Sequence, residues 1–376
     1  MPLLWSSGCT GREREGIRPY RGIDMGGGFW YDVGNNSKEA PMSHEQRFRN
    51  KVTAMSTLCS VLVVFLHAYA FNDGPQPTAA YHMEFFLSRV LAQTAVPVFF
   101  ALSAFLFYRN FTMDMLPGKW KSRVHTLLIP YIIWNILSML AFWFLAKLPF
   151  INTPAFQITP MTVLRSVIAY EYNLTFWFVY NLILLVALAP VVYGLMKNRY
   201  VGIAVILTLV GVYSFYTREI YLGDFGKIEI RAAVFYYLGA WCGLHLRQQV
   251  VQARFHWTGA AALAVAAVIC YVWDWLPICY ITARLLMIYG VFSLSDLAAE
   301  VTIPKFFQCS FPIYAMHNLI LETFNKIFSF VLPVGSNWIL VDYFGSTVMT
   351  ILIICACNAL LLKFAPKVHS VIFGGR

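Results

Sequence analysis

The chain is 376 residues long, and with 59% hydrophobic and only 12% charged residues it is far more apolar than soluble domains, which have roughly 45–50% and 25%. Its formal net charge is +10, but the basic residues are scattered in short segments, which argues against a nucleic-acid partner. The apolar composition predicts an all-α polytopic integral membrane protein. Because no Cys-x-x-Cys occurs, we expect no metal site, and we expect no bound cofactor.

Residues 1–44 differ from the rest of the chain. They are polar and irregular, and they lack the apolar segment of a signal peptide. They are either a disordered cytosolic tail or an upstream extension that is not translated, with Met25 and Met42 as alternative starts. We therefore expect residues 45–376 to form the membrane domain, and removal of residues 1–41 should change neither insertion nor activity.

Apolar runs of spanning length predict about ten transmembrane helices, because roughly 20 apolar residues cross the hydrocarbon core. Within 257–294, Trp273-Asp-Trp-Leu-Pro277 leaves only a tight turn between two predicted helices. The ten predicted ranges are 52–71, 89–108, 124–146, 174–194, 200–217, 231–246, 257–276, 277–294, 306–332 and 345–362.

Lysine and arginine in the connecting segments predict the orientation, since cytoplasmic loops are enriched in these residues. With the amino terminus inside, most basic residues fall on the inner side, and an even number of helices returns the carboxyl terminus to that side. Both termini are therefore expected in the cytoplasm. The inner segments contain Arg109, Lys119, Lys121, Arg123, Lys197, Arg199, Arg247, Arg254, Lys305, Lys363, Lys367 and Arg376.

The first predicted helix ends in a histidine. An uncharged apolar run from Ser56 reaches His67 and is followed by the turn residues Phe71-Asn-Asp-Gly-Pro75. Ionisable groups inside a spanning segment are costly and point to function, and imidazole is the natural general base near neutral pH. His67 is therefore our candidate base, and the alternative is a histidine that only packs at the membrane interface.

Two later helices carry further candidates. Pro97 should kink the second helix, and Ser103 is followed by a small residue that allows close helix approach. Arg89 opens the same helix on the predicted outer side. Tyr314 and His317 are three residues apart and share a helix face, which suits either a pair that lines a cavity or an oriented structural pair.

The predicted inner side holds its richest basic cluster between the second and third helices. Such a cluster would attract the phosphates of an anionic ligand. Positive-inside topology alone also requires basic residues here, so both explanations stay open. The cluster consists of Arg109, Lys119, Lys121 and Arg123.

One arginine lies inside an apolar run. Arg284 falls in the middle of the eighth predicted helix, where an unpaired charge is expensive. It should face the protein interior and pair, either with Asp274 or with a substrate anion.

Six sequence fragments, taken in order over residues 52–365, resemble the acyltransferase 3 family of membrane acyltransferases. Each fragment is short, but their order and spacing agree with the family. They are Val63-Val-x-x-His67, Val96-Pro-x-Phe-Phe-x-x-Ser-Ala-Phe-Leu106, the Lys119–Arg123 segment before Pro130-Tyr131, Trp177-Phe178, Tyr237-Leu-Gly239 and Ser310-Phe-x-Ile-Tyr-x-x-His317.

The resemblance implies a transfer of an acyl group, often acetyl from cytosolic acetyl-CoA, to hydroxyls of cell-envelope sugars. The expected partners are then the lipid bilayer, an acyl-CoA donor and a carbohydrate or glycolipid acceptor, in the inner membrane of a bacterium. On this basis His67, His317 and Tyr314 are the candidate catalytic residues, and the basic cluster is the candidate donor site. The candidate substrate-binding residues are Arg89, Ser103, Arg284 and Trp177.

Two positions depart from the family pattern. The family usually has an arginine eleven residues before the first-helix histidine, and here that position is Ser56. Its Ser-Gly in the second helix is Ser103-Ala104 here. A catalytically inactive relative is therefore one alternative. A secondary transporter with His67, His317 and Arg284 along its path is another, although no repeated halves support it.

Overall fold

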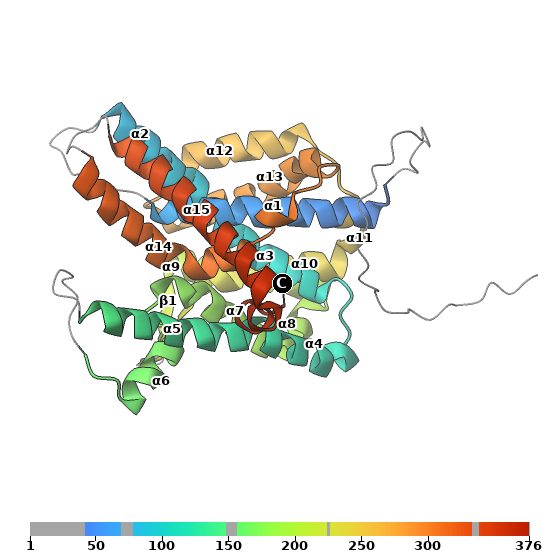
Figure 1. Cartoon of the computed structure of the whole chain (residues 1–376). Coiled ribbons are helices and arrows are strands. Elements are labelled where there is room, and N and C mark those ends of the chain that lie inside the picture. The colour runs from blue at the N-terminus through green and yellow to red at the C-terminus, as the bar shows by residue number, and fades with distance from the viewer. Residues whose placement is uncertain (1–41, 69–77, 148–155, 224–225, 333–337, 376) are drawn as a thin grey trace, which may run out of the picture. The chain divides into compact units, whose positions relative to one another are not determined.

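Helices form nearly all of the part of the chain that the computed structural model describes, which is residues 42–68, 78–147, 156–223, 226–332 and 338–375 (Figure 1). The predicted tail therefore lies outside the described residues except for its last three. The helices of the first half are α1 (His44–His67), α2 (Ala79–Phe85), α3 (Ala95–Tyr108), α4 (Leu116–Arg123), α5 (Ile129–Leu145), α6 (Pro160–Ile168), α7 (Trp177–Ala187), α8 (Ala189–Met196) and α9 (Arg199–Phe215).

The second half continues in the same way after a two-stranded antiparallel hairpin, β1 (Glu219–Tyr221) and β2 (Lys227–Glu229), which the sequence analysis did not predict. Its helices are α10 (Ile230–His245), α11 (Arg247–Gln252), α12 (Trp257–Trp273), α13 (Pro277–Leu294), α14 (Ser310–Val331), α15 (Ile339–Phe364) and α16 (Pro366–Phe373). Short 3-10 or π turns are η1 (Phe86–Leu91), η2 (Ala92–Thr94), η3 (Met113–Met115), η4 (Val124–Leu128), η5 (Leu174–Phe176), η7 (Ser295–Ala298) and η8 (Lys305–Phe307).

The membrane character of the chain is supported by helix length and composition. Five described helical stretches are long and apolar enough to cross a membrane, and a bent pair of helices would make six. Every one of the ten predicted ranges contains a helix, but the number of ten spans and the inside position of both termini stay predictions. The five stretches are His44–His67, Ala79–Tyr108, Met113–Leu145, Pro277–Ala298 and Ile339–Phe364.

The predicted helix 174–194 is wrong as a single element. It divides into η5 with α7 and then α8, and the two parts meet at an angle of 68°. Pro190 explains the break, because it has no N–H to bond the carbonyl of Val186 and its ring clashes with that turn. The indole N–H of Trp120 donates to this same carbonyl at 2.8 Å, so α4 packs against the bend and holds it.

The second predicted helix begins earlier than expected and is irregular. Helical structure starts at Ala79, ten residues before the predicted range 89–108, and runs to Tyr108. The geometry changes from π through 3-10 to α in the two turns before Pro97. This agrees with the predicted distortion, since proline removes one hydrogen bond from the helix.

A glycine pair brings α10 against α3. A Cβ added at Gly239 would lie only 2.1 Å from the carbonyl oxygen of Ala101, and one at Gly243 would lie 3.0 Å from that of Phe105. Glycines four residues apart let two helix backbones meet in this way. The contact is the most extensive between two helices in the described chain, and it fixes α3 as a wall of the site.

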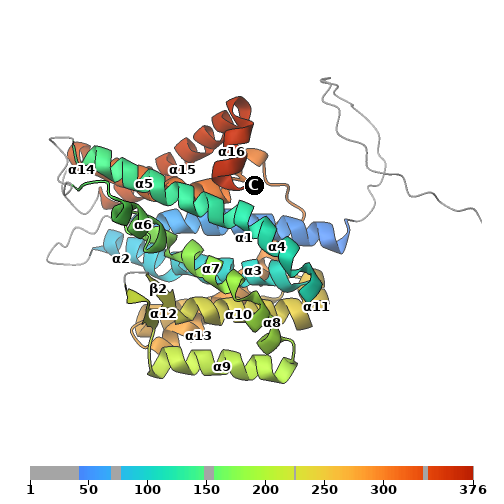
Figure 2. The same cartoon turned by 90° about the horizontal axis from the view of Figure 1, so that it is seen from below.

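Helix α1 lies at the centre of the described bundle. It contacts α3 on one side and α14 and α15 on the other, as Figures 1 and 2 show. Its first turn is capped by Ser43, whose side chain accepts a hydrogen bond from the N–H of Gln46. The helix therefore brings its last residue, His67, between α3 and α14.

Candidate active site

The last turn of α1 is held in place from outside the helix. The carbonyl of Phe65, in this last turn, accepts hydrogen bonds from the hydroxyls of Ser88 at 2.9 Å and Tyr343 at 3.2 Å. At the other end, the buried Lys51 donates to the carbonyl of Ala253 at 2.9 Å. Both ends of α1 are thus fixed, which positions His67.

His67 and His317 lie side by side. Their ring centroids are 5.2 Å apart with an interplanar angle of 42°. His317 is fully buried on α14, and its Nδ1–H donates to the carbonyl of Tyr314 at 2.8 Å and, more weakly, to that of Ile313 at 3.2 Å. A protonated Nδ1 leaves Nε2 with a lone pair. This Nε2 is buried and bonds to no side chain or backbone group in the described residues.

The expected pairing of Tyr314 with His317 takes a different form. The two side chains are neighbours, with ring centroids 6.1 Å apart, but the bond between them runs from the His317 ring to the Tyr314 backbone. The phenol O–H of Tyr314 donates instead to the carbonyl of Thr175. Tyr314 is therefore an anchor between α14 and η5, and its hydroxyl proton is already in use.

His67 opens into a cavity of about 220 Å³, which we name the histidine cavity. The imidazole is enclosed by the bundle yet exposed to this space. Three other predicted residues, Arg89, Trp177 and Tyr314, line the same cavity. Its lining residues are Val63, Leu66, His67, Arg89, Gln93, Val96, Pro97, Phe100, Thr175, Trp177, Phe178, Arg231, Phe235, Tyr280 and Tyr314.

One charged residue of the histidine cavity was not predicted from the sequence. Arg231 is in the first turn of α10, at the start of the predicted range 231–246. Its guanidinium lies over the ring of Trp177, 4.7 Å from the ring centroid, and Nη1 donates to the hydroxyl of Tyr280 at 3.0 Å. A signal was present in the sequence, since Arg231 falls inside the predicted span.

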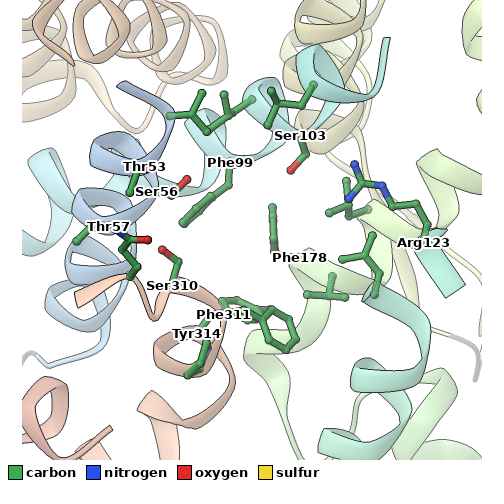
Figure 3. Close-up of a pocket in the computed structure, with 18 residues that line it drawn as sticks. Thr53, Ser56, Thr57, Phe99, Ser103, Arg123, Phe178, Ser310, Phe311 and Tyr314 are labelled. Atoms are coloured by element: carbon green, nitrogen blue, oxygen red, sulfur yellow. The ribbon is translucent and has the colours of Figure 1, made fainter. Parts of the chain in front are cut away.

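A second, larger cavity of about 430 Å³ lies on the other side of α3 residues Phe99 and Ser103, and we name it the hydroxyl cavity (Figure 3). Most of its polar groups are hydroxyls, and Arg123 is the one cation among its described lining residues. The residues that line it are Val52, Thr53, Ser56, Thr57, Phe99, Leu102, Ser103, Leu106, Arg123, Leu127, Phe178, Val179, Leu182, Gln308, Ser310, Phe311, Pro312 and Tyr314.

The hydroxyl cavity contains Ser56, which departs from the family pattern, and Ser103, which is a predicted substrate-binding residue. Ser56 on α1 and Ser103 on α3 face it, and Figure 3 shows Arg123 extending into it from the opposite wall. The position that the resemblance assigns to an arginine is therefore part of a cavity wall, and its distance of eleven residues from His67 keeps it away from the histidine pair.

Two aromatic residues separate the cavities. Phe178 and Tyr314 line both, and their ring centroids are 5.7 Å apart in an edge-to-face arrangement. Phe178 also packs against Phe100 with centroids 4.5 Å apart. These two rings form the part of the wall that the cavities share, which we name the aromatic partition.

The predicted basic cluster is divided by the fold. Of its four residues, Arg123 is the one found among the described lining of the two cavities. Arg109 forms an ion pair with Glu45 at 2.8 Å, and Lys119 donates to the backbone carbonyl of Phe107. The four residues therefore do not form one binding surface around the hydroxyl cavity. The fourth, Lys121, is exposed.

Arg284 pairs as predicted. It is fully buried, and its Nη1 lies 3.0 Å from the carboxylate of Asp274. The guanidinium also lies 4.2 Å from the ring centroid of Tyr280. Arg284 lines neither cavity, but through Tyr280 it supports a residue that does.

The titratable groups of the site suit acid–base chemistry. Two adjacent imidazoles, one of them open to a cavity, provide a proton acceptor with a neighbour that can orient it. In the part of the chain that is described, no group of three or more His, Cys, Asp and Glu side chains is placed to hold a metal ion.

Comparison of the chain with known protein families finds the acyltransferase 3 family, described as an acyltransferase domain, over residues 52–359. This range includes both cavities and the two histidines. No match was found among curated proteins or among solved structures.

Proposed function

The chain belongs to the acyltransferase 3 family, and from this premise we propose that it moves an acetyl or other short acyl group from a cytosolic acyl-CoA to a hydroxyl of a cell-envelope carbohydrate. The observation that carries the proposal is the His67–His317 pair, with ring centroids 5.2 Å apart, at the wall of an open cavity. The proposed site of action is the inner membrane of a bacterium.

The acceptor hydroxyl enters the histidine cavity in this proposal. His67 takes its proton, and the oxygen attacks the carbonyl carbon of the thioester. The C–S bond then breaks, and the leaving thiolate takes the proton from the imidazolium, so that an ester and free CoA result. A histidine is suited to both steps because its pKa is ordinarily near the working pH.

His317 acts on His67 rather than on the substrate. Its Nδ1–H is used by the backbone of Tyr314, so its Nε2 can only accept a hydrogen bond. The ring of His67, with its centroid 5.2 Å from that of His317, is the group that we propose to donate this bond. Such a bond would fix the tautomer of His67 and leave its other nitrogen free to act as the base.

The donor enters the hydroxyl cavity. Arg123 supplies one fixed positive charge for a phosphate of CoA, and Lys119 adds charge nearby, since both cations lie against the ring of Phe107. The hydroxyls of Ser56, Ser103 and Ser310 line the rest of the wall, and they suit the amide-rich arm that carries the thioester. The acyl group then meets the acceptor at the aromatic partition.

Sealed membrane vesicles test the proposal directly. Radiolabelled acetyl-CoA is added outside inside-out and right-side-out vesicles that contain the protein, with envelope carbohydrate from cells that lack the gene present on both sides of the membrane. We expect label in the carbohydrate only when the donor reaches the cytoplasmic face. If no label leaves CoA in either orientation, the chain is an inactive relative, and uptake of an intact solute would instead indicate a transporter.

A further inference from the structure

The ion pair of Arg231 is oriented with its positive member toward the histidine cavity. Nε of Arg231 lies 3.0 Å from Oε2 of Glu229, and the side chain of Arg231 is 29% exposed while that of Glu229 is 4% exposed. The carboxylate of Glu229 is therefore buried behind the cavity wall, and the guanidinium of Arg231 faces the cavity. A molecule in the cavity meets a cation.

Glu229 is also shared with a second cation. Its Oε1 lies 3.1 Å from Nζ of Lys227, which in turn contacts Glu219 at 2.6 Å. Although partial burial disfavours its charge, hydrogen bonds to Glu219 and Glu229 hold the pKa of the Lys227 ammonium above its usual value. Lys227 thus stays protonated, and the buried Glu229 is shared between Lys227 and Arg231.

The guanidinium of Arg231 is fixed before any ligand arrives. The ring of Trp177 lies against it, and the hydroxyl of Tyr280 accepts a hydrogen bond from Nη1. Arg284, one turn after Tyr280 on the same helix α13, packs its guanidinium against the ring of Tyr280. In Arg231, Nη1 is occupied by the hydroxyl of Tyr280 and Nε faces the carboxylate of Glu229, and no hydrogen bond or ion pair of Nη2 is found among the described residues, so its N–H groups can bind a ligand. A fixed fork of this kind binds carboxylate or phosphate oxygens well.

We propose that the histidine cavity takes an acceptor saccharide that bears an anionic group, a carboxylate or a phosphate, and that this group binds Arg231. Arg89 lines the same cavity, and no acidic side chain is found among its described lining residues. The apolar faces of sugar rings pack on aromatic side chains, which this cavity offers in number. They are Phe100, Trp177, Phe178, Phe235, Tyr280 and Tyr314.

This inference rests on the proposed function, and the first experiment separates the two. Envelope glycans from cells with the gene, without it and with His67→Gln are divided into acidic and neutral fractions by anion exchange, and their esters are measured by mass spectrometry. We expect the acidic fraction to lose an ester when the gene is absent or carries His67→Gln. Loss from neutral glycans alone would overturn the anionic acceptor and keep the acyltransferase, whereas no loss in any fraction would overturn both.

The second experiment tests Arg231 itself. The acidic glycan from cells without the gene serves as acceptor for the purified protein with acetyl-CoA. Arg231→Gln should raise the KM for this acceptor about 10-fold or more, because a charge-assisted contact is lost, while the KM for acetyl-CoA changes less than about twofold. Arg231→Lys keeps the positive charge but not the two-pronged guanidinium, so its KM for the acceptor should lie between those of the parent and Arg231→Gln. Arg218→Gln, at an exposed arginine before β1, is the matched control.

The acceptor can also be changed instead of the protein. Reduction of its carboxyl groups, or removal of its phosphates, should abolish the preference of the parent protein for the acidic glycan, and the effective treatment identifies the group. An unchanged acceptor KM after both treatments, or after Arg231→Gln in a correctly folded protein, would show that Arg231 serves only the ion pair with Glu229.

Discussion

The two cavities differ in what they offer a ligand. The hydroxyl cavity is about 430 Å³ and has one cation, Arg123, among hydroxyl and apolar groups. The histidine cavity is about 220 Å³ and contains an imidazole and two arginines. The larger one suits a long, flexible donor with a few charged groups, and the smaller one suits a compact polar acceptor that must be oriented for reaction.

This division also explains why the two cavities meet at so few residues. Acyl transfer requires that water stay away from the thioester, so two substrates that enter from different sides should meet through a narrow contact. Phe178 and Tyr314 are the described residues common to both linings. The comparison predicts that changes in one cavity affect one substrate, and that changes at the partition affect the balance between transfer and hydrolysis.

The largest effect is expected in the histidine cavity. His67→Gln should lower acyl transfer by about 10²–10⁴-fold, the usual contribution of a general base, because glutamine keeps polarity and size but cannot take a proton at neutral pH. The KM for acetyl-CoA should stay unchanged. Turnover of the purified variant with labelled acetyl-CoA measures both quantities.

His44→Gln is the matched control for this change, since His44 is exposed at the other end of α1. It should transfer at the parent rate. If His67→Gln also transfers at close to the parent rate, the proton acceptor is another group, and His317 is the first to test.

The next effect belongs to the hydroxyl cavity. Arg123→Gln should raise the KM for acetyl-CoA roughly 10–100-fold, since a hydrogen bond to a charged group contributes about 1.5–3 kcal/mol. The acceptor KM should not change. Initial rates at varied concentrations of each substrate separate the two.

Lys121→Gln provides the comparison, because Lys121 is on the same helix but is exposed and lines neither cavity. We expect a change in donor KM of less than about twofold, as for other exposed charges. Equal effects of the two variants would mean that the basic cluster acts through topology or general charge, not through the cavity.

Much of this site could be predicted from the amino-acid sequence alone. His67, Arg89, Trp177 and Tyr314 are far apart in sequence, but each lies in a motif or at the end of an apolar run, and all line one cavity. Helix positions were predictable for the same reason, since apolar runs of spanning length form helices in a bilayer.

The rest depended on contacts that no local pattern encodes. The bend after Ala187 required weighing Pro190 against a long apolar run. The role of Arg231 depends on Glu229 being buried behind it and on Trp177 lying against it, and these are tertiary facts. The hairpin β1–β2 is only three residues per strand, too short for alternation to be visible.

The partition between the cavities should give a smaller effect of another kind. Phe178→Ala removes a ring that lies between the linings and packs on Phe100 and Tyr314. We expect hydrolysis of acetyl-CoA to rise several-fold relative to transfer, because water then reaches the thioester. Phe178→Leu keeps most of the volume and should stay near the parent ratio.

Release of free acetate against labelled ester, measured in one reaction, gives this ratio. A general loss of both products in Phe178→Ala, with an unchanged ratio, would mean that the ring supports the fold and does not exclude water. Thermal unfolding in detergent would then show a comparable drop for the alanine variant and a smaller one for the leucine variant.

The smallest predicted effect concerns Ser56, the serine at the position where the family usually has an arginine. Ser56 lies on the wall of the hydroxyl cavity across from Arg123. If the family arginine attracts the donor, Arg123 already supplies part of that attraction here. Ser56→Arg should then lower the KM for acetyl-CoA by only about two- to fivefold, the size of a partly screened charge contribution of up to about 1 kcal/mol.

Ser56→Ala separates charge from volume and should leave both KM values near the parent, because the cavity keeps its other hydroxyls. The combination Ser56→Arg with Arg123→Gln is the decisive variant. If a cation on either wall can hold the donor, the double variant should recover most of the affinity lost in Arg123→Gln. No recovery, in a protein that is folded and inserted, would show that the two walls bind different parts of the donor and that the serine marks a change in donor rather than a replaced charge.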